Sequence, residues 1–590
     1  MLKQYYQEEL EYLRELGREF AREYPTLAPS LAEAASDPDV ERVLEGTAFL
    51  TGSVRSKLAD DLPEITHALL EMLWPHYLRP VPSTSIVEFL HPAKPKITGS
   101  TRVDRVTTEL ESVPVDGTPC RFRTCYDVDI HPLRIVEARL ETTGRGLLRL
   151  RFELFPGAKR DELRLDPLRL HLSGELPVAS TLYLWLVHHA TDGYIEVAGP
   201  RGKPTRTALA APSPLVRRVG FGEDEGLFPY PSHSFSGYRL LQEYFTLPGK
   251  FLFVDLHGLA ALGSLESADA FDVVLNFRER PPEALRVSAE SFRLHCTPVV
   301  NLFARDADPI RLDHRRVNYL LRPSDPEPSH FEVYSVERVT GLAPGSGHRR
   351  DYLPFHSFRH GMMSGDARAI YYKLRRRSAI GKTPNSDCSM SFVTAEERGV
   401  LPETEAISLE LICTNRRLPE SLKPGDISRH TDSSPQFVDF RNITPLTKSV
   451  LPPLEGGLHW RLISHLSLNY ASLASAEALR GLLSLYNFQA LYDQKEERAN
   501  KLRLESIVCV ESKRSERLFH GAPMRGLHTQ IDLLEDHFAS EGELYLFASV
   551  LEEFLALYVT VNAFSQVTVR GTQKGEVYQW RPRVGKQLLI

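Results

Sequence analysis

Residues 1–24 place apolar side chains at steps of three and four, with glutamate and arginine between them. This spacing gives one apolar face of an α-helix. The face consists of Tyr6, Leu10, Leu13, Leu16, Phe20 and Tyr24. At 1.5 Å per residue such a helix is about 35 Å long. Pro25 ends it, because proline cannot continue the backbone hydrogen bonds.

Two further helices are predicted before residue 80. At residues 36–38 a capping aspartate precedes a proline at the first helical position, and this second helix runs to about Leu58. A third helix begins near Leu62 and ends before Pro75. Three helices with short joints predict an N-terminal helical bundle over residues 1–84.

The pattern changes after Pro82. Short segments alternate apolar and polar side chains, and proline or glycine separates them, which is typical of antiparallel sheet. The segments that show it best are 85–89, 121–123, 146–152, 163–165 and 168–172. The apolar stretch 181–187 also has the length of a strand. We therefore predict two β-rich domains, over residues 85–290 and 291–455.

Helical periodicity returns after residue 456. The expected elements are one or two helices over 458–486, strands at 502–510 and 528–534, a helix at 543–558, and strands at 564–570 and 576–580. This order predicts a C-terminal α/β domain of ββαβ type over residues 456–590. Helix 543–558 is apolar almost all round, which favours a helix packed on its own sheet; a helix–helix partner surface is the alternative. The whole chain is thus expected to be α+β and multidomain.

Composition narrows the class of protein. A chain of 590 residues is too long for one core, and 42% hydrophobic and 25% charged residues are ordinary for a soluble protein. A net charge of −6 argues against a dedicated nucleic-acid binder. No apolar run is long enough to cross a bilayer, and residues 1–24 have no apolar signal core. Six scattered cysteines fit buried thiols in a reducing compartment. We expect a cytoplasmic protein without direct membrane insertion.

Two patterns could hold a metal, and neither is convincing. His356 and His360 have the spacing of a helical zinc pair, but nearby proline and glycine favour a loop and surface histidines. Cys120 and Cys125 have no second Cys or His pair nearby, so ordinary strand residues are the better interpretation. We expect no metal site.

Other chemistry-bearing patterns are equally weak. Asp127 and Asp129 resemble the metal-holding acidic pair of sugar transferases, a match that any two acids two apart would make. Lys373–Arg377 is a basic run, more typical of a solvated or partner-facing strand than of a nucleic-acid site. No phosphate-binding loop, dinucleotide loop or Gly-x-Ser-x-Gly motif occurs. We expect no cofactor and no catalytic set, and therefore no enzyme.

The first helix is a candidate partner interface, because interfaces favour aromatic side chains. The candidate residues are Tyr6, Leu10, Leu13, Phe20 and Tyr24. The alternative, that this helix only docks on its own bundle, has equal support.

Several segments resemble one known family. The opening YYQEELEYLRELGREFAREYP over 5–25 is similar to the start of the TssF family (also called ImpG or VasA), baseplate subunits of bacterial type VI secretion systems. Further segments that resemble this family are 37–42, 75–83, 226–230, 235–245, 300–303, 413–419, 460–470 and 580–585. They occur in the family's order and span almost the whole chain.

The resemblance implies a structural role like that of a wedge protein in contractile phage baseplates. Two copies of the chain would join one TssG, and TssK and TssE would complete a wedge. Six wedges would surround the spike hub and form the platform for the tube and sheath. The particle would be recruited to the inner face of the cytoplasmic membrane, where it docks on the envelope membrane complex.

Two other functions compete with the structural role. A carbohydrate-active β-rich enzyme would need paired carboxylates across a cleft, and spacing alone does not exclude it. A secreted effector is less favoured, because the chain carries no recognisable toxic module.

Overall fold

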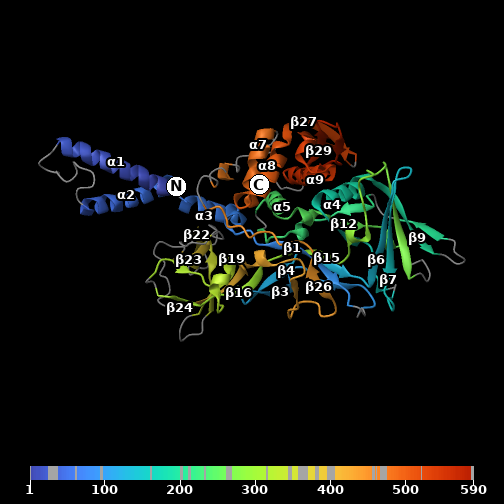
Figure 1. Cartoon of the computed structure of the whole chain (residues 1–590), viewed down its shortest axis with the longest axis horizontal. Helices are drawn as coiled ribbons and strands as arrows, with labels where there is room; N and C mark the ends of the chain where they lie inside the picture. Colours follow the sequence, from blue (N-terminus) through green and yellow to red (C-terminus); the bar gives the residue numbers. More distant parts are fainter. Residues whose placement is uncertain are drawn as a thin grey trace. The chain divides into compact units, whose positions relative to one another are not determined.

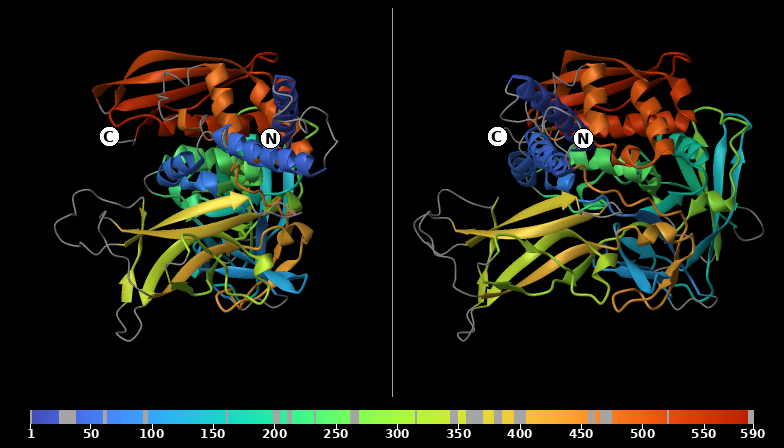
Figure 2. Two further views of the ribbon diagram at one scale, coloured as in Figure 1. Left: turned by 90° about the vertical axis from the view of Figure 1, so that its left-hand side faces the viewer. Right: turned by 60° about the vertical axis from the view of Figure 1, so that its left-hand side comes forward.

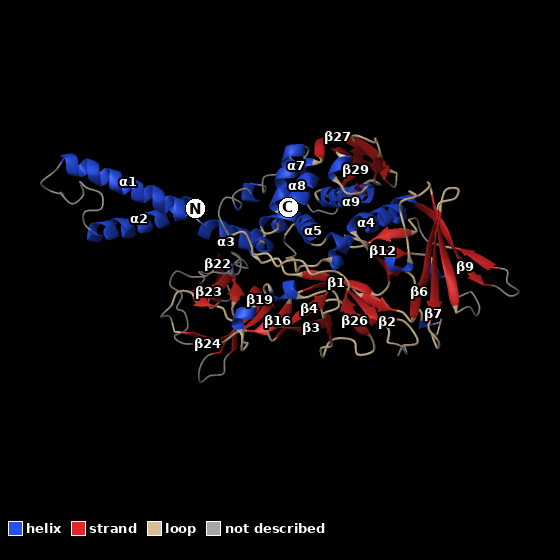
Figure 3. Ribbon diagram, in the orientation of Figure 1, coloured by secondary structure: helices blue, strands red, loops and turns tan. Residues whose placement is uncertain are grey.

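The computed structural model combines helices and strands (Figure 3). It describes residues 2–23, 38–59, 63–92, 97–159, 162–198, 204–209, 214–231, 234–260, 269–313, 316–342, 349–355, 370–378, 385–394, 405–454, 459, 462–464, 475–519 and 521–585. The chain divides into two compact units. The first holds residues 1–78 with 453–467, and the second holds 79–452 with 468–590.

The first unit contains the three predicted helices, α1 (Leu2–Glu23), α2 (Pro38–Ala59) and α3 (Pro63–Leu73). Their positions confirm the helices expected from the sequence. Helices α1 and α2 lie side by side (Figures 1 and 2). Each helix has a fully buried alanine, Ala21 in α1 and Ala48 in α2, and small side chains let two helix backbones approach closely.

A short 3₁₀ helix, Pro75–Leu78, follows α3 and is fully buried. A distant segment joins it: the ring of His459 lies 4.9 Å from that of His67 and 6.2 Å from that of Tyr77, measured between ring centroids. The first unit is therefore completed by residues beyond the predicted bundle of 1–84, and the four-domain division stays a prediction.

A six-stranded antiparallel sheet in the second unit has the strand order β25-β3-β4-β15-β1-β26. Its strands are β1 (Thr84–Leu90), β3 (Glu109–Val115), β4 (Thr118–Thr124), β15 (Cys296–Val300), β25 (Ile427–Arg429) and β26 (Asp439–Asn442). Phe89 of β1, Phe122 of β4 and Phe440 of β26 share one apolar core. Since β1 pairs with both β15 and β26, segments from both sides of residue 290 build this sheet.

Residues 101–293 form three further groups of strands, in the orders β10-β9-β13-β7-β6, β11-β12-β8-β14 and β2-β5. Their bounds are β2 (Thr101–Val103), β5 (Val128–Ile130), β6 (Leu133–Glu141), β7 (Leu147–Leu154), β8 (Leu168–Leu172), β9 (Ala190–Ala198), β10 (Pro204–Ala208), β11 (Val216–Arg218), β12 (Phe253–Leu256), β13 (Ala270–Phe277) and β14 (Phe292–Arg293). The predicted strand 163–165 is wrong. These residues form no strand, and the Arg164 backbone N–H donates to Ser100 Oγ at 2.7 Å.

Two sheets between residues 303 and 414 share a second apolar core, which includes Met390 and Ile407. Their orders are β16-β24-β19-β20, with β17 also on β24, and β18-β23-β22-β21. The bounds are β16 (Phe303–Asp306), β17 (Ile310–Leu312), β18 (Tyr319–Leu320), β19 (Glu332–Leu342), β20 (Arg349–Asp351), β21 (Leu353–Pro354), β22 (Ile370–Ser378), β23 (Ser386–Thr394) and β24 (Glu405–Thr414).

Two helices interrupt the strands, α4 (Leu176–Leu184) and α5 (Ser236–Thr246). The strand suggested for 181–187 is therefore wrong, because α4 covers its first half and a π-helical turn, Trp185–His189, covers the rest. Pro177 stands in the first turn of α4, a position that favours helix initiation. Leu182, Tyr183 and Leu184 are all buried, so no alternation distinguished helix from strand.

The C-terminal elements follow the predicted ββαβ order: β27 (Ile507–Phe519), β28 (Ala522–Leu533), α9 (Glu541–Leu557) and β29 (Ala563–Gly571). Helices α7 (Ala476–Leu485) and α8 (Gln494–Glu505) precede them, and β30 (Val577–Gln579) and β31 (Arg583–Val584) follow. Residues 502–505, predicted as strand, belong to α8, which begins at the capping side chain of Asp493. Strand β28 is parallel to β29, as a crossover helix between them requires.

Helix α9 is buried over nearly its whole circumference. It packs on β29 of its own sheet, as predicted, and also on α4 and α5. Tyr545 of α9 stacks on Trp580, with ring centroids 5.5 Å apart. Glu552, only 3% exposed at its side chain, pairs with Arg218 and with Arg583. These ion pairs tie α9 to β11 and β31.

The carboxyl groups of Glu541, the first residue of α9, and of Glu576 should make stability depend on pH. Burial, then the hydrogen bond and charge of Glu541, raise the pKa of Glu576 to about 7. The folded state therefore keeps a proton that the unfolded chain loses above its ordinary pKa of 4.5. Stability should fall as pH rises from about 4.5 through 7, because protons bound only by the folded state favour it at low pH.

The Glu576→Gln variant tests this expectation. Its thermal midpoint should change less between pH 5 and pH 8 than that of the unchanged chain, and it should be the more stable protein at pH 8. Equal pH slopes for the two proteins would show that the Glu541–Glu576 pair does not set the dependence.

Candidate functional site

The predicted cysteine pair is buried and chemically quiet. Burial raises the pKa of both the Cys120 and the Cys125 thiol to about 12, whereas metal ligation and nucleophilic attack need the thiolate. Cys509 is half-buried and the other five cysteines are buried, which agrees with their predicted use as small apolar residues. Within the described ranges no three His, Cys, Asp or Glu side chains are arranged to hold a metal. His356 and His360 lie outside those ranges.

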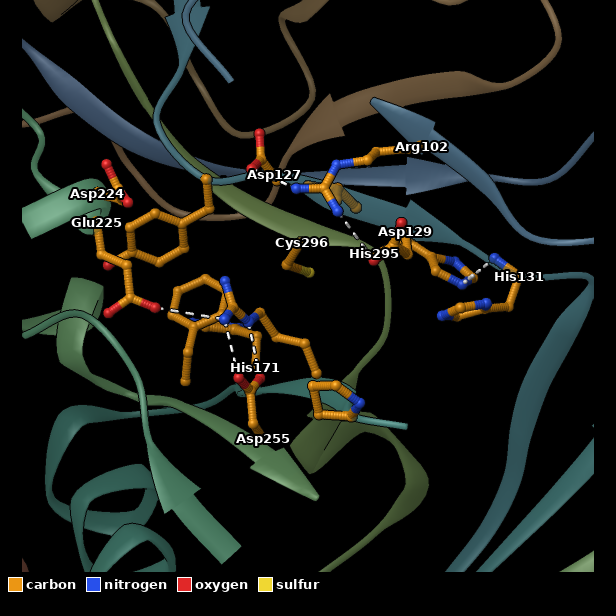
Figure 4. Close-up of a pocket in the computed structure, with 15 residues that line it drawn as sticks. Arg102, Asp127, Asp129, His131, His171, Asp224, Glu225, Asp255, His295 and Cys296 are labelled. Carbon is orange, nitrogen blue, oxygen red and sulfur yellow. Dashed lines mark hydrogen bonds and ion pairs between the residues drawn. The ribbon is translucent and has the colours of Figure 1, made fainter. Parts of the chain in front are cut away.

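Asp127 and Asp129 line a cavity of about 290 Å³ in the second unit, together with Arg102 (Figure 4). Arg102 donates to Asp127 Oδ2 at 2.6 Å. Burial by itself would raise the pKa of Asp127, but hydrogen bonds from the Arg105 backbone N–H and from Arg102 lower it overall. A general acid needs a raised pKa, so Asp127 lacks the feature that a glycosidase acid requires.

The basic run lies on β22, and one member has a structural task. Arg376 donates to the backbone oxygens of Val333 and Tyr334 at 2.7 and 3.1 Å. Lys373 and Arg377 are exposed. This mixture fits the predicted solvated or partner-facing strand, with one arginine used to hold two strands together.

The predicted interface row lies on α1, where its members differ in exposure. Tyr6, Leu10 and Leu13 are half-buried, whereas the side chain of Phe20 is exposed. Tyr24 lies outside the described residues. Because α1 packs against α2, we infer that the half-buried row is the one that α2 covers. This part of the predicted interface therefore belongs to the packing of α1 against α2, the helical hairpin of the first unit.

A second apolar row on α1 faces solvent. Tyr12, Leu16 and Phe20 follow one another at steps of four residues, which places them on one helix face. Tyr12 is 60% exposed and Leu16 is 46% exposed. Aromatic and leucine side chains in a continuous exposed row are typical of a protein-binding surface.

Helix α2 carries a third row that the sequence prediction missed. Val43, Leu50 and Val54 share one face at helical spacing, and they are 67%, 66% and 57% exposed. The buried residues of the same helix, Ala48 and Gly52, fall on the opposite face at 100° per residue. A helix that is apolar on two opposite faces is normally covered on both.

The exposed rows of α1 and α2 therefore form a candidate interface, which we call the hairpin surface: Tyr12, Leu16, Phe20, Val43, Leu50 and Val54. The sequence feature that could have revealed the α2 part of this surface is the presence of apolar residues on both faces of 38–58. Among the described residues, no helix is both long enough and apolar enough to cross a bilayer.

Known proteins match the chain along its whole length. The sequence profile of the family "Type VI secretion system, TssF" matches residues 1–587. The protein "Type VI secretion system component TssF1" of Pseudomonas aeruginosa is 32% identical over 624 aligned positions, which cover 99% of each chain.

Two solved structures are similar in fold as well as in sequence. A chain in the structure of the type VI secretion system TssK-TssF-TssG baseplate subcomplex has a TM-score of 0.76 and 34% identity, covering 93% of this chain and 99% of that one. A chain in the structure of the baseplate complex from the type VI secretion system has a TM-score of 0.65 and 31% identity, covering 100% of both. This full-length agreement in sequence and fold shows that the chain belongs to the TssF family of the type VI secretion system.

Proposed function

We propose that this chain works as a structural wedge subunit of the baseplate, assembled with TssG and TssK. The observation that carries the proposal is the full-length similarity to a chain solved in the TssK-TssF-TssG baseplate subcomplex and to a chain solved in the baseplate complex of the type VI secretion system. TssE, the spike hub and a second copy of the chain would complete its surroundings, as the family resemblance implies. The role is assembly in the cytoplasm at the inner face of the membrane, not catalysis.

The hairpin surface is the proposed site of contact with TssG. A permanent interface often buries more than about 2,000 Å² and is relatively apolar. Exposed Leu50 and Val54 on α2 and Tyr12 and Leu16 on α1 supply apolar area of this kind on neighbouring helices. Two copies of one chain would meet different neighbours in a wedge, and paired helices offer several faces to do so.

Co-expression with the neighbouring baseplate proteins tests the proposed assembly. We expect a stable complex after affinity purification, with native mass spectrometry giving two copies of this chain for each TssG. A well-behaved monomer that ignores TssG and TssK would contradict the proposal. A complex with another ratio would leave the scaffold role in place and overturn the two-copy wedge.

A further inference from the structure

His171 is a buried polar side chain that has no hydrogen-bond partner among the residues that the structure describes. It lies on β8, is 3% exposed and lines the cavity of about 290 Å³. Neither of its ring nitrogens has a hydrogen-bond partner among the described residues. An unsatisfied buried polar group lowers stability, so such a group needs an explanation. A ligand that enters the cavity and donates a hydrogen bond would supply it.

The imidazole of His171 is suited to accept that hydrogen bond. Burial, and then the charge of Arg293, lower its pKa to about 3. The ring is therefore neutral near pH 7, and a neutral imidazole has one nitrogen that accepts and one that donates. Its ring packs on Phe253, with centroids 4.6 Å apart, which fixes its position.

Negative charge outweighs positive charge in the lining of the cavity. Five carboxylates line it against two guanidinium groups: Asp127, Asp129, Asp224, Glu225 and Asp255 against Arg102 and Arg169. Tyr126 and Phe253 line it as well, and the guanidinium carbon of Arg169 already lies 5.6 Å from the centroid of the Tyr126 ring. Carboxylates combined with aromatic faces are the usual surroundings of a bound organic cation.

Both arginines of the cavity are already occupied by carboxylates. Arg169 donates to Asp255 Oδ1 and Oδ2 at 2.8 and 2.9 Å. Arg102 pairs with Asp127 at 2.6 Å and lies 4.0 Å from Asp129. An anion would have to displace these carboxylates from the arginines. Asp129, which lies too far from Arg102 for a hydrogen bond, can still accept hydrogen bonds from a new donor.

The cavity is open at one side. The side chain of Asp224 is 87% exposed and that of Arg102 is 55% exposed, whereas His171 and His295 are buried. We propose that this cavity binds the guanidinium group of an arginine side chain from a partner protein. The planar fork of guanidinium offers five donors, which can engage a carboxylate and the neutral imidazole at the same time. This inference goes beyond the baseplate role and does not depend on it.

Binding of a capped arginine to the full-length chain tests the proposal. Ligand-observed NMR would measure N-acetyl-arginine methylamide, its neutral citrulline analogue, spermidine and inorganic phosphate. We expect saturable binding of the arginine compound and at least tenfold weaker binding of the citrulline compound. Saturable phosphate binding without arginine binding would overturn the cation assignment. Equal or tighter binding of spermidine would indicate a polyamine site and would overturn the protein partner. No saturable binding at all would overturn the proposal.

Variants of the lining make the test specific. His171→Phe keeps an aromatic ring on Phe253 and removes both nitrogens, so it should weaken arginine binding at least tenfold while raising the thermal midpoint. Asp129→Asn changes a half-exposed side chain and should weaken binding without affecting folding. Glu283→Gln, which removes an exposed carboxylate that does not line the cavity, is the matched control. Unchanged affinity in both cavity variants would place the bound cation elsewhere and overturn the site.

Discussion

Replacing Leu50 and Val54 of α2 together by aspartate is expected to abolish co-purification of this chain with TssG. Both side chains are more than half exposed and lie on the face of α2 opposite to its buried alanine. Burying a leucine or valine contributes roughly 1.5–3 kcal/mol each, and an unpaired carboxylate in the contact would add a desolvation cost. The combined loss should weaken binding by a factor of at least about 100.

Arg42→Asp is the matched control for that double variant. It changes the charge of the same helix by the same two units, at a side chain that is 77% exposed and outside the apolar row. We expect it to co-purify with TssG at the unchanged yield. Far-ultraviolet circular dichroism should show that both variants keep their helices. Normal co-purification of the double aspartate variant would remove the α2 row from the interface.

Removing α1, or charging Leu10, Leu13 and Phe20 together, is also expected to abolish co-purification with TssG. The structure shows why this result would be harder to interpret. Leu10 and Leu13 are half-buried on a helix that packs against α2, so charges there would disrupt the hairpin as well as its outer surface. Charging the exposed row on α2 separates the two effects, because those side chains do not pack between α1 and α2.

Strong periodicity made the helices of the first unit predictable. The row that includes Leu10 and Leu13 predicted α1, and the Asp-Pro pair at residues 37–38 predicted where α2 begins. The same reasoning placed α9 within two residues at each end. These elements are long, and each repeats its pattern over several turns, so a local irregularity does not change the outcome.

Short apolar runs were harder to interpret. Residues 181–187 have the length of a strand, yet α4 and a π-helical turn occupy them. The C-terminal half of α4 is largely buried where the helix crosses α9, and a run of buried apolar residues has no polar face to reveal a helical period. Long-range packing, which no local pattern contains, decided this element.

Sheet pairing and surface exposure also could not be predicted. Strand β1 lies between β15 and β26, partners more than 200 and 300 residues later in the sequence. Apolar residues on both faces of α2 were readable from the sequence, but only the structure shows that Val43, Leu50 and Val54 are exposed. The role of His171 in the cavity could not be predicted either, because its place in the alternating segment 168–172 is that of an ordinary strand residue.

The close crossing of α4 and α9 makes Gly542→Ala a strongly destabilising change. A Cβ atom on Gly542 would lie 2.2 Å from the backbone carbon and oxygen of Ser180. Neither partner can move away alone, because α9 is also held by α5 and β29. Overpacking of this kind usually costs about 1–3 kcal/mol, and contact with backbone instead of a flexible side chain places this variant at or above the upper end.

Gly481→Ala gives the matched control, since it makes the same substitution in α7, where a Cβ would meet nothing within 4 Å. There the change should stabilise by up to about 1 kcal/mol, because alanine favours a helix over glycine. Chemical denaturation monitored by tryptophan fluorescence can compare the two variants, since Trp580 stacks on Tyr545 of α9. If Gly542→Ala unfolded at the same denaturant concentration as Gly481→Ala, α4 and α9 would have to cross at a greater distance than the structure shows. Opposite shifts of the two midpoints would mean that backbone contact at Ser180, and not helix propensity, sets the requirement for glycine at residue 542.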